Sequence, residues 1–386
     1  MTNKKFKVGV VGLGFIGPAH IEGVRRLGDE VVGIVGKDLE EAQTSAAALH
    51  IEKAYATYDE MIADPEIEIV HICSPNYLHY SHAVKAIEAG KHVICEKPLT
   101  VTAKESAALV ELAKNKQLAC AVNYNLRYYP VNHEAREIVR KGELGKIHNI
   151  HGSYLQDWLL LPTDWNWRLL PKEGGALCSV ADIGSHWIDM VMFVTGLRVT
   201  AVMADLGTSI PVRKRPLGEV ETFAGKMGGK EQAYEDVEVT GDDFANILFH
   251  FSNGAKGSLA VSQVSAGRKN ALRYEIDGAQ SSVAWNSETP DELWRGYRGR
   301  YNEILIKDPS IMSPAAQAVA SYPGGHTEGF PDTFKQLAKK VNAYIRRGDY
   351  SAAPDFPTFA DGHAALVIEE AILESSQTGR WVNVSV

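Results

Sequence analysis

Between residues 7 and 122, short apolar runs alternate with longer segments in which apolar residues recur at helical spacing. Each apolar run is too short for a helix, so we predict strands there. The strands are predicted at Lys7–Val11, Glu30–Val35, Ile67–Cys73, Lys91–Cys95 and Leu118–Val122. The helices are predicted at Pro18–Leu27, Asp59–Ala63, Leu78–Ala89, and from a cap at Thr100 or Thr102 to Asn115. Repeated β-α units of this size predict a doubly wound parallel sheet with right-handed crossovers.

The pattern changes in the remainder of the chain, which we predict to form a second domain at 126–386 after a first domain at 1–125. Alternating positions, with few helices between them, predict a mostly antiparallel or mixed sheet. Its strands are predicted at Lys146–Gln156, Ala201–Ile210, Phe244–Phe251, Ala255–Val264 and Ala271–Gly278. The helices are predicted at Val131–Arg140, Glu328–Arg346 and Thr358–Ser376, with a surface excursion at Pro211–Tyr234 and a long loop region at Ser287–Gly325.

A glycine-rich turn lies between the first predicted strand and helix. Gly12, Gly14 and Gly17 have the G-x-G-x-x-G spacing, with Phe15 and Ile16 between them. Such glycines permit a tight turn, a close approach of the backbone to a pyrophosphate, and close packing of helix on strand. The following helix offers N–H groups to phosphates. The turn therefore favours a dinucleotide-binding Rossmann domain over a tight turn without a ligand.

The end of the second strand bears on the choice of cofactor. An acidic residue that binds the adenosine ribose is expected there, but the strand ends in Gly36, Lys37 and Asp38. Gly36 leaves room for a 2′-phosphate and Lys37 puts a cation beside it, whereas Asp38 is able to serve the ribose if the turn bends back. A solvated turn is the alternative. The cofactor is therefore predicted to be NAD or NADP, with weak discrimination between the two.

Polar residues follow three of the predicted parallel strands. They are Ser74 and Asn76, Glu96 and Lys97, and Asn123. The carboxyl ends of parallel strands line one crevice, where ligands bind. Lys97 is held before Pro98 at such an end, where partial loss of water suits a lysine to act as a general acid or base. The alternative is a solvated lysine paired with Glu96.

Two stretches of the second domain carry candidate chemistry. Trp158, Trp165 and Trp167 lie among Asp157, Asp164, Asn166 and Arg168. This combination suits either a sugar-binding surface or a tryptophan-rich corner of the core. Further along, Asp182, His186 and Asp189 fall on one face of a predicted helix. An imidazole among carboxylates is able to shuttle protons near neutral pH, although a structural histidine is the alternative.

The composition narrows the range of partners and compartments. The 386 residues carry a net charge of -8 without a basic block, so nucleic acid and anionic membrane are disfavoured. No long apolar stretch or signal core is present, and we expect a cytoplasmic protein. The four cysteines show no metal-ligand spacing, so free thiols are predicted, with no disulfide framework and no bound metal.

These motifs together resemble the Gfo/Idh/MocA oxidoreductases over nearly the whole chain. The resemblance is carried by the glycine loop, by Ser74-Pro75-Asn76 with His79, by Glu96-Lys97-Pro98, and by the Gly174-Gly175 segment followed by Asp182 and His186. The tryptophan-rich segment and Gly324-Gly325-His326 are more similar to the sugar and inositol dehydrogenase branches than to biliverdin reductases.

The resemblance implies an amino-terminal Rossmann domain joined to an α/β domain with a large open sheet. It also implies oxidation of a secondary hydroxyl on a sugar or cyclitol by hydride transfer to nicotinamide. Lys97 is then the acid/base residue, and Asp182 and His186 position the substrate and assist proton transfer. A cis peptide bond between Lys97 and Pro98 and a homo-oligomer, either dimer or tetramer, are further expectations. The alternatives are a keto-sugar reductase working in reverse and a non-catalytic dinucleotide-binding regulator.

The predicted sites comprise residues from both domains. The cofactor site is predicted to include Gly12, Gly14, Phe15, Ile16, Gly17, Lys37, Ser74, Asn76, His79, Glu96, Lys97, Asn123, Trp165 and Arg168. The substrate site is predicted to include Lys97, Arg127, Tyr154, Asp157, Trp165, Arg168, Asp182, His186 and His326.

Overall fold

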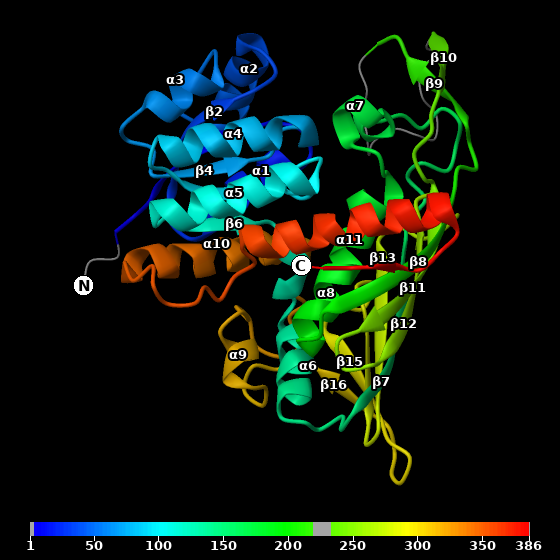
Figure 1. The fold of residues 1–386 in the computed structure, drawn as a ribbon. Coiled ribbons are helices and arrows are strands. Elements are labelled where there is room, and N and C mark those ends of the chain that lie inside the picture. The colour runs from blue at the N-terminus through cyan, green and yellow to red at the C-terminus, as the bar shows by residue number, and fades with distance from the viewer. Residues whose placement is uncertain (1–3, 219–232, 386) are drawn as a thin grey trace. The chain divides into compact units, whose positions relative to one another are not determined.

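The computed structural model describes residues 4–218 and 233–385 (Figure 1). The chain forms two compact units, of which the first runs to Tyr128 and takes in Gly329–Leu366. The second comprises Tyr129–Glu328 and the chain from Val367 onward. Residues 329–366 thus pack with the first unit, whereas the sequence prediction placed all of 126–386 in the second domain. No helix in the described parts of the chain is both long and apolar enough to cross a membrane.

The first unit contains a six-stranded parallel sheet with the strand order β3-β2-β1-β4-β5-β6, which confirms the predicted doubly wound sheet. Its strands are β1 (Lys7–Val11), β2 (Glu30–Val35), β3 (Lys53–Ala54), β4 (Ile69–Ile72), β5 (His92–Cys95) and β6 (Cys120–Val122). The chain order reverses between β1 and β4, which are neighbours in the sheet. In open sheets this switch point is where the ligand crevice forms.

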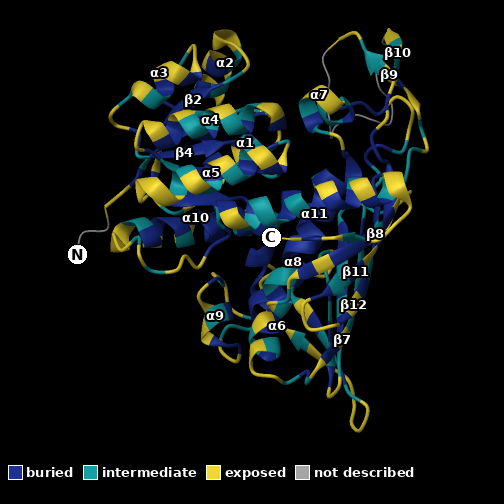
Figure 2. Ribbon diagram, in the orientation of Figure 1, coloured by how far each residue is buried: buried dark blue, intermediate teal, exposed yellow. Residues whose placement is uncertain are grey.

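The helices of the first unit include the predicted ones and one that the sequence analysis missed. They are α1 (Ile16–Arg26), α2 (Leu39–Leu49), α3 (Tyr58–Ala63), α4 (Asn76–Glu88), α5 (Ala103–Lys116), the 3-10 turn η1 (Asn125–Tyr128) and α10 (Phe330–Arg347). The missed helix, α2, is rich in alanine and buries only Ala42 and Ala46, so its apolar periodicity is weak. Figure 2 shows strands of this sheet in dark blue beneath helices whose outer residues are yellow.

Helix α10 joins the first unit by packing along α1. A side chain on Gly23 of α1 would press against Phe334 and Lys335, so the glycine permits this approach. Next to it, the buried carboxylate of Asp29 accepts hydrogen bonds from the backbone N–H of Phe6 and the amide of Asn342. These long-range contacts explain why a helix so late in the chain belongs to this unit.

The second unit contains a nine-stranded sheet with the order β16-β15-β14-β13-β7-β12-β11-β8-β17. The pair β7 and β12 is parallel and the other pairs are antiparallel, which confirms a mixed, mostly antiparallel sheet. The strands are β7 (Ile147–Leu155), β8 (Val199–Gly207), β11 (Phe244–Phe251), β12 (Lys256–Ser262), β13 (Ala271–Gly278), β14 (Ser282–Asn286), β15 (Glu292–Gly296), β16 (Glu303–Ile306) and β17 (Val382–Asn383). The helical segments are α6 (Pro130–Arg140), η2 (Trp167–Leu169), α7 (Pro171–Gly174), the π-helical turn η3 (Val180–Gly184), α8 (Ser185–Thr195) and α9 (Pro314–Gln317). Helix α11 (Phe359–Thr378) begins in the first unit and continues into the second, since the boundary falls after Leu366.

Two of the predicted loop regions contain regular structure. The region Ser287–Gly325 holds β15, β16 and α9, so its prediction as a long loop was wrong. The strands β15 and β16 form one end of the sheet. β16 contains a short apolar run, Ile304 to Ile306, but both isoleucines are exposed, so the strand does not alternate between a buried and a solvent-facing side. The excursion Pro211–Tyr234 contributes to a two-stranded sheet of β9 (Val212–Pro216) and β10 (Tyr234–Glu238), while its residues 219–232 lie outside the described part.

Candidate active site

The glycine loop between β1 and α1 has the close approaches that a dinucleotide-binding turn needs. Gly12 has a φ of +93°, and a side chain there would collide with the backbone of Cys73 and Ser74. A side chain on Gly17 would collide with the carbonyl oxygen of Gly12. At Gly14, by contrast, nothing lies within 4 Å of the place a Cβ would take. The loop therefore suits a pyrophosphate, because Gly12 and Gly17 pack closely against the protein backbone and the backbone at Gly14 is open to a ligand.

The amino end of α1 is suited to an anion. Phe15 precedes the helix without a side-chain cap, and the first turn contains no acidic residue. Arg25 and Arg26 lie in the last turn, where they complement the helix dipole. The backbone N–H groups and the positive end of the dipole at Ile16 thus meet no competing carboxylate from the first turn.

Ser74 and His79 connect the turns after β4 and β5. The ring nitrogens of His79 lie 2.8 Å from the carbonyl oxygen of Pro98 and 2.8 Å from that of Ser74. Both partners are acceptors, so the two bonds form together only when the ring carries both protons. The Ser74 hydroxyl lies 3.1 Å from Nδ1 of His82, and burial lowers the pKa of His82 to about 4. His79 is thus a buried tie between two turns that are predicted to contact the cofactor.

Glu96 lies at the centre of a buried polar cluster at the carboxyl end of β5. Its carboxylate lies 2.9 Å from Nε2 of His20 and accepts a hydrogen bond from the Asn123 amide. Nδ1 of His20 lies 2.8 Å from Nδ1 of His71. Burial has the largest single effect and raises the pKa of Glu96. The hydrogen bond and charge of His20, the charge of Lys97 and the hydrogen bond from Asn123 together outweigh burial, and the pKa falls to about 2. Glu96 is therefore a buried anion that links α1, β4 and β6 to the end of β5.

Lys97 follows this anion directly and is half-buried. Its backbone N–H donates to Oε2 of Glu96 at 3.1 Å. The Lys97–Pro98 peptide bond is cis, which confirms the expectation from the resemblance. The lysine thus belongs to a turn whose backbone N–H is held by the neighbouring carboxylate.

In the second unit, the carboxylate of Asp182 is held on both oxygens. Nε of Arg168 lies 3.1 Å from Oδ1, and the Gln263 amide donates to Oδ2 at 2.7 Å. Asp182 lies in the π-helical turn that leads into α8, where the sequence predicted a regular α-helix. Such turns interrupt the regular spacing of side chains and are frequent at functional sites. An aspartate with both oxygens engaged orients other groups better than it accepts a proton.

His186 and Tyr154 lie near this carboxylate in the second unit. His186 is 8% exposed, and its ring centroid lies 6.4 Å from that of Tyr154. The Tyr154 hydroxyl donates to the side-chain oxygen of Asn270 at 2.6 Å, and Gln156 donates to the same oxygen at 2.8 Å. Asn270 therefore fixes two polar side chains at the end of β7.

The tryptophan segment divides between the two predicted interpretations. Trp158 and Trp165 belong to a core cluster with Leu159, so for these two the core alternative holds. Trp167 is partly exposed, and the guanidinium of Arg168 lies 4.3 Å from its ring centroid. Of the three tryptophans, Trp167 is thus the one whose ring is open enough for the predicted sugar contact.

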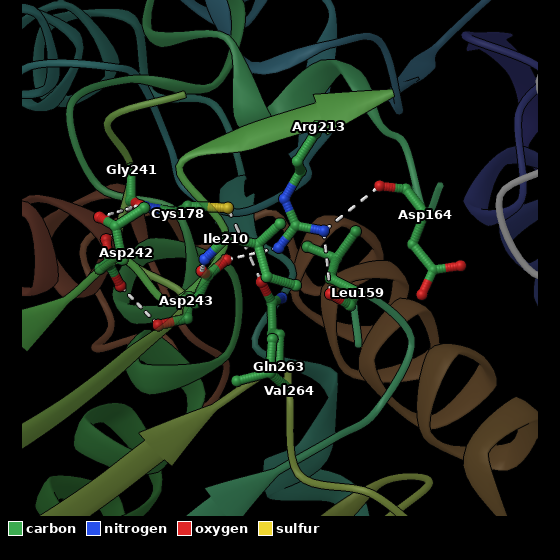
Figure 3. A network of polar contacts seen from close by, with 12 residues as sticks. Leu159, Asp164, Cys178, Ile210, Arg213, Gly241, Asp242, Asp243, Gln263 and Val264 are labelled. Atoms are coloured by element: carbon green, nitrogen blue, oxygen red, sulfur yellow. Dashed lines mark hydrogen bonds and ion pairs between the residues drawn. The ribbon is translucent and has the colours of Figure 1, made fainter. Parts of the chain in front are cut away.

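The dipeptide Asp242-Asp243 contacts both Cys178 and Arg213 (Figure 3). Asp242 accepts hydrogen bonds from the backbone N–H groups of Cys178 and Val180, at 2.7 and 2.8 Å, just before η3. The carboxylate of Asp243 forms a fully buried ion pair with Arg213 at 2.6 Å. Arg213 in turn donates at 2.9 Å to the carbonyl oxygen of Leu159, as Figure 3 shows. Through Arg213, Asp243 is therefore connected to the tryptophan segment, and the adjacent Asp242 is connected to the turn that carries Asp182.

Of four other predicted site residues, Arg127 and Asp157 form ion pairs, and Lys37 and His326 have exposed side chains. Arg127 forms an ion pair with Asp361 at 2.9 Å. Asp157 accepts from Lys269 at 2.7 Å, and the side chains of His326 and Lys37 are exposed. These contacts do not join the four side chains to one another, so their roles in binding stay predictions.

Family comparison supports the interpretation of both units. The family described as "Oxidoreductase family, NAD-binding Rossmann fold" matches residues 6–124, and the GFO/IDH/MocA C-terminal domain matches residues 132–284. The chain belongs to the Gfo/Idh/MocA oxidoreductase family.

Several relatives within this family resemble the chain along nearly its whole length. The levoglucosan dehydrogenase of Pseudarthrobacter phenanthrenivorans is 32% identical over 99% of this chain and 98% of its own. The glucose-6-phosphate 3-dehydrogenase of Bacillus subtilis is 23% identical over 98% of this chain and 99% of its own. A structure of levoglucosan dehydrogenase in complex with NADH and L-sorbose superposes with a TM-score of 0.88, at 30% identity and 99% coverage of both chains.

For this Gfo/Idh/MocA chain, sequence motifs identified Lys97, Asp182 and His186 but missed their supporting residues. Gln263 and Asn270 lie just outside β12 and β13 and belong to no recognisable motif. The available signal was a polar residue directly after or before a predicted apolar strand. Which carboxylate or hydroxyl each amide reaches depends on pairing between strands, which a motif search does not provide.

His82 gives a first test, because it couples stability to pH beside Ser74. The unfolded chain takes up a proton on this histidine below its ordinary pKa of 6.5, whereas the folded chain does so only near 4. Acid between these values therefore favours unfolding, by up to about 2–3 kcal/mol. We expect His82→Phe, which keeps the stacking on Tyr58, to flatten the fall of the unfolding free energy over this range in urea titrations. His50→Gln, at an exposed histidine, is the control, and equal slopes in both variants and the wild type would contradict the assignment.

Arg213 gives a second test, because its removal leaves Asp243 as an uncompensated buried charge. We expect Arg213→Met to lower the free energy of unfolding by about 3–5 kcal/mol. The matched control is Arg215→Met on the same strand, because Arg215 pairs with Glu235 and both side chains are more than 40% exposed. Its loss is expected to stay within about 1 kcal/mol. Urea unfolding measures both, and equal losses would refute a special role for the buried pair.

Proposed function

We propose that this chain oxidises a secondary hydroxyl of a sugar, sugar derivative or cyclitol by hydride transfer to NAD. The observation that carries the proposal is the presence of Lys97, Asp182 and His186 together in a chain similar to a sugar dehydrogenase over its full length. Such a set of an acid/base group and orienting groups matches the requirements of alcohol oxidation.

The first unit supplies the residues that would hold the cofactor. The glycine loop and the start of α1 suit the pyrophosphate, as argued from the collisions at Gly12 and Gly17 and the open position at Gly14. Ser74, Asn123 and the turn at Lys97 are proposed to complete the binding surface at the strand ends. When bound, the nicotinamide accepts the hydride that leaves the substrate carbon.

Lys97 is proposed to accept the proton that the hydroxyl loses. As the C–H bond breaks with its electron pair, the O–H bond breaks and its proton passes to the lysine amine, which must therefore be neutral before the step. The ionised Glu96 lies next to it and holds the backbone of the turn. This hydrogen bond holds the backbone from which the lysine side chain extends.

Asp182 and His186 are proposed to orient the reacting hydroxyl. Both oxygens of Asp182 are already engaged by Arg168 and Gln263, so a substrate hydroxyl donates to a fixed carboxylate whose position costs little to maintain. His186 is able to exchange a proton with the substrate or to donate a hydrogen bond. Trp167 and Arg168 are proposed to contact the sugar ring.

The charge balance in this region favours a neutral substrate. The guanidinium of Arg168 is compensated by the carboxylate of Asp182, so the pair offers no net positive charge to a phosphate. Among the relatives, levoglucosan dehydrogenase has been solved with the neutral sugars levoglucosan and L-sorbose. We therefore place uncharged sugars ahead of sugar phosphates in a substrate screen, with the reverse reduction of a keto-sugar as the second activity to test.

Replacement of Lys97 tests the acid/base role. Lys97→Met leaves the glycine loop intact, so NADH binding is expected to persist while kcat for sugar oxidation falls by about 100-fold or more. The control is Lys104→Met, an exposed lysine of α5, which is expected to leave both quantities unchanged. A rise in KM with kcat unchanged would contradict the assignment, because it would indicate a binding role alone. Retained binding with no sugar turnover in the wild type would instead favour the regulator.

We also propose that the chain forms a homo-oligomer through the open face of the nine-stranded sheet. This face contains a hollow of about 790 Å³ lined by β7 and β12–β16. In it, Ile304 pairs across the strands with Trp294, and Trp294 pairs with Ala284, which makes an apolar row. Glu275 pairs with Ala284, and His151 pairs with Glu275, so these two residues continue the row toward the middle strands of the sheet. A ring nitrogen of His151 and carboxylate oxygens of Glu275 and Asp277 lie within 4.8 Å of one another. An apolar edge beside a charged centre suits the self-complementary contact of a dimer.

The oligomer is tested by replacing one apolar residue of that row. Ile304 is 59% exposed, and Ile304→Glu is expected to weaken association because it places a charge in the proposed interface. Ile311→Glu, at an isoleucine that is 74% exposed outside the hollow, is the control. Light scattering coupled to size exclusion measures the mass of each variant. A monomeric wild type, or equal effects of the two changes, would refute the interface.

A further inference from the structure

The carboxyl end of β2 lacks the acidic residue that holds the adenosine ribose in many dinucleotide-binding domains. Gly36 directly follows the last residue of the strand, Val35. The glycine loop lies beside this end, because the N–H of Gly12 donates to the carbonyl oxygen of Val35 at 2.9 Å. The space around Gly36 therefore belongs to the surface on which the adenosine half of a dinucleotide binds.

A carboxylate from the next helix fills this space. Oε2 of Glu41, in the first turn of α2, accepts a hydrogen bond from the backbone N–H of Lys37 at 2.6 Å. A Cβ on Gly36 would lie only 2.5 Å from this same oxygen. The negative charge that the strand does not carry is thus present at its end, supplied from α2.

The neighbouring charged residues are placed differently. Asp38 is the N-cap of α2, and its Oδ1 accepts from the N–H of Glu41 at 2.8 Å, so its carboxylate serves the helix. The Lys37 side chain is exposed, and its backbone rather than its ammonium group contacts Glu41. Consequently, neither the ribose role considered for Asp38 nor the phosphate role considered for Lys37 describes the local geometry as well as a role for Glu41.

We propose that Glu41 selects NAD over NADP in this chain. Its carboxylate is positioned to accept a hydrogen bond from an adenosine ribose hydroxyl and to repel a phosphate at the 2′ position. The sequence alone predicted weak discrimination, because Gly36 leaves room for the phosphate and Lys37 adds a cation. The carboxylate of Glu41 reverses that expectation. The inference deepens the proposed function, since it requires that the first unit bind a dinucleotide.

The test measures binding without turnover. Fluorescence titration without sugar gives Kd for NADH and NADPH in the wild type, in Glu41→Gln and in Glu41→Lys. The wild type is expected to bind NADH more tightly, and Glu41→Gln is expected to reduce the ratio of Kd(NADPH) to Kd(NADH) by about tenfold, the effect of losing one charged hydrogen bond and one repulsion. Glu41→Lys is expected to reduce the ratio further. The control is Glu40→Gln, an exposed neighbour on the same helix, which is expected to leave the ratio unchanged.

A relocated carboxylate sharpens the test. In the double variant Gly36→Asp/Glu41→Ala, the alanine removes the oxygen that lies 2.5 Å from the place of the new Cβ, and the remaining contacts are 3.1 Å or longer. NADH preference is expected to return. A ratio that is equal in the wild type and in Glu41→Gln, or a wild type that binds both cofactors equally, would overturn the role of Glu41 alone. A wild type that binds neither dinucleotide would instead overturn the proposed function, and this proposal with it.

Discussion

A buried anion at the end of β5 is the constraint around which the first unit is built. Glu96 is buried, so its charge is tolerable only with His20 from α1 and Asn123 after β6 in place. The same two contacts require that the helix after the glycine loop and the last strand of the sheet reach their final positions. The loop that suits a pyrophosphate and the turn that carries Lys97 are therefore parts of one electrostatic arrangement.

Much of this architecture was predictable because it is encoded over short distances in the chain. Five parallel strands and the glycine loop follow from apolar runs and turn residues that are adjacent in sequence. The short strand β3, the alanine-rich α2 and the strands β15 and β16 were missed, since each has little buried apolar surface of its own. Likewise, nothing local to α10 indicates that it packs along α1, because Gly23 and Phe334 meet only through tertiary structure.

The candidate site was predictable to a different extent. Motifs identify the residues that are proposed to carry the chemistry, such as Lys97 and Asp182, because their types and spacing recur. They do not identify the residues that hold these groups in place, such as Gln263, whose partner lies 81 positions away in the chain. Glu41 illustrates the same limit over a short distance. Its side chain extends from α2 past the N-cap residue Asp38 to the end of β2, where a residue of the strand itself usually supplies the carboxylate.

The burial of Arg213 also determines how the β9–β10 sheet joins the rest of its unit. Both partners of the ion pair are inaccessible to water. If β9 separated from the rest of the unit while one partner stayed buried, either the Arg213 guanidinium or the Asp243 carboxylate would be a buried charge without a partner. Partial attachment is therefore less favourable than either complete attachment or complete release. The strands β9 and β10 and the tryptophan segment that Arg213 contacts are consequently expected to gain or lose their order together.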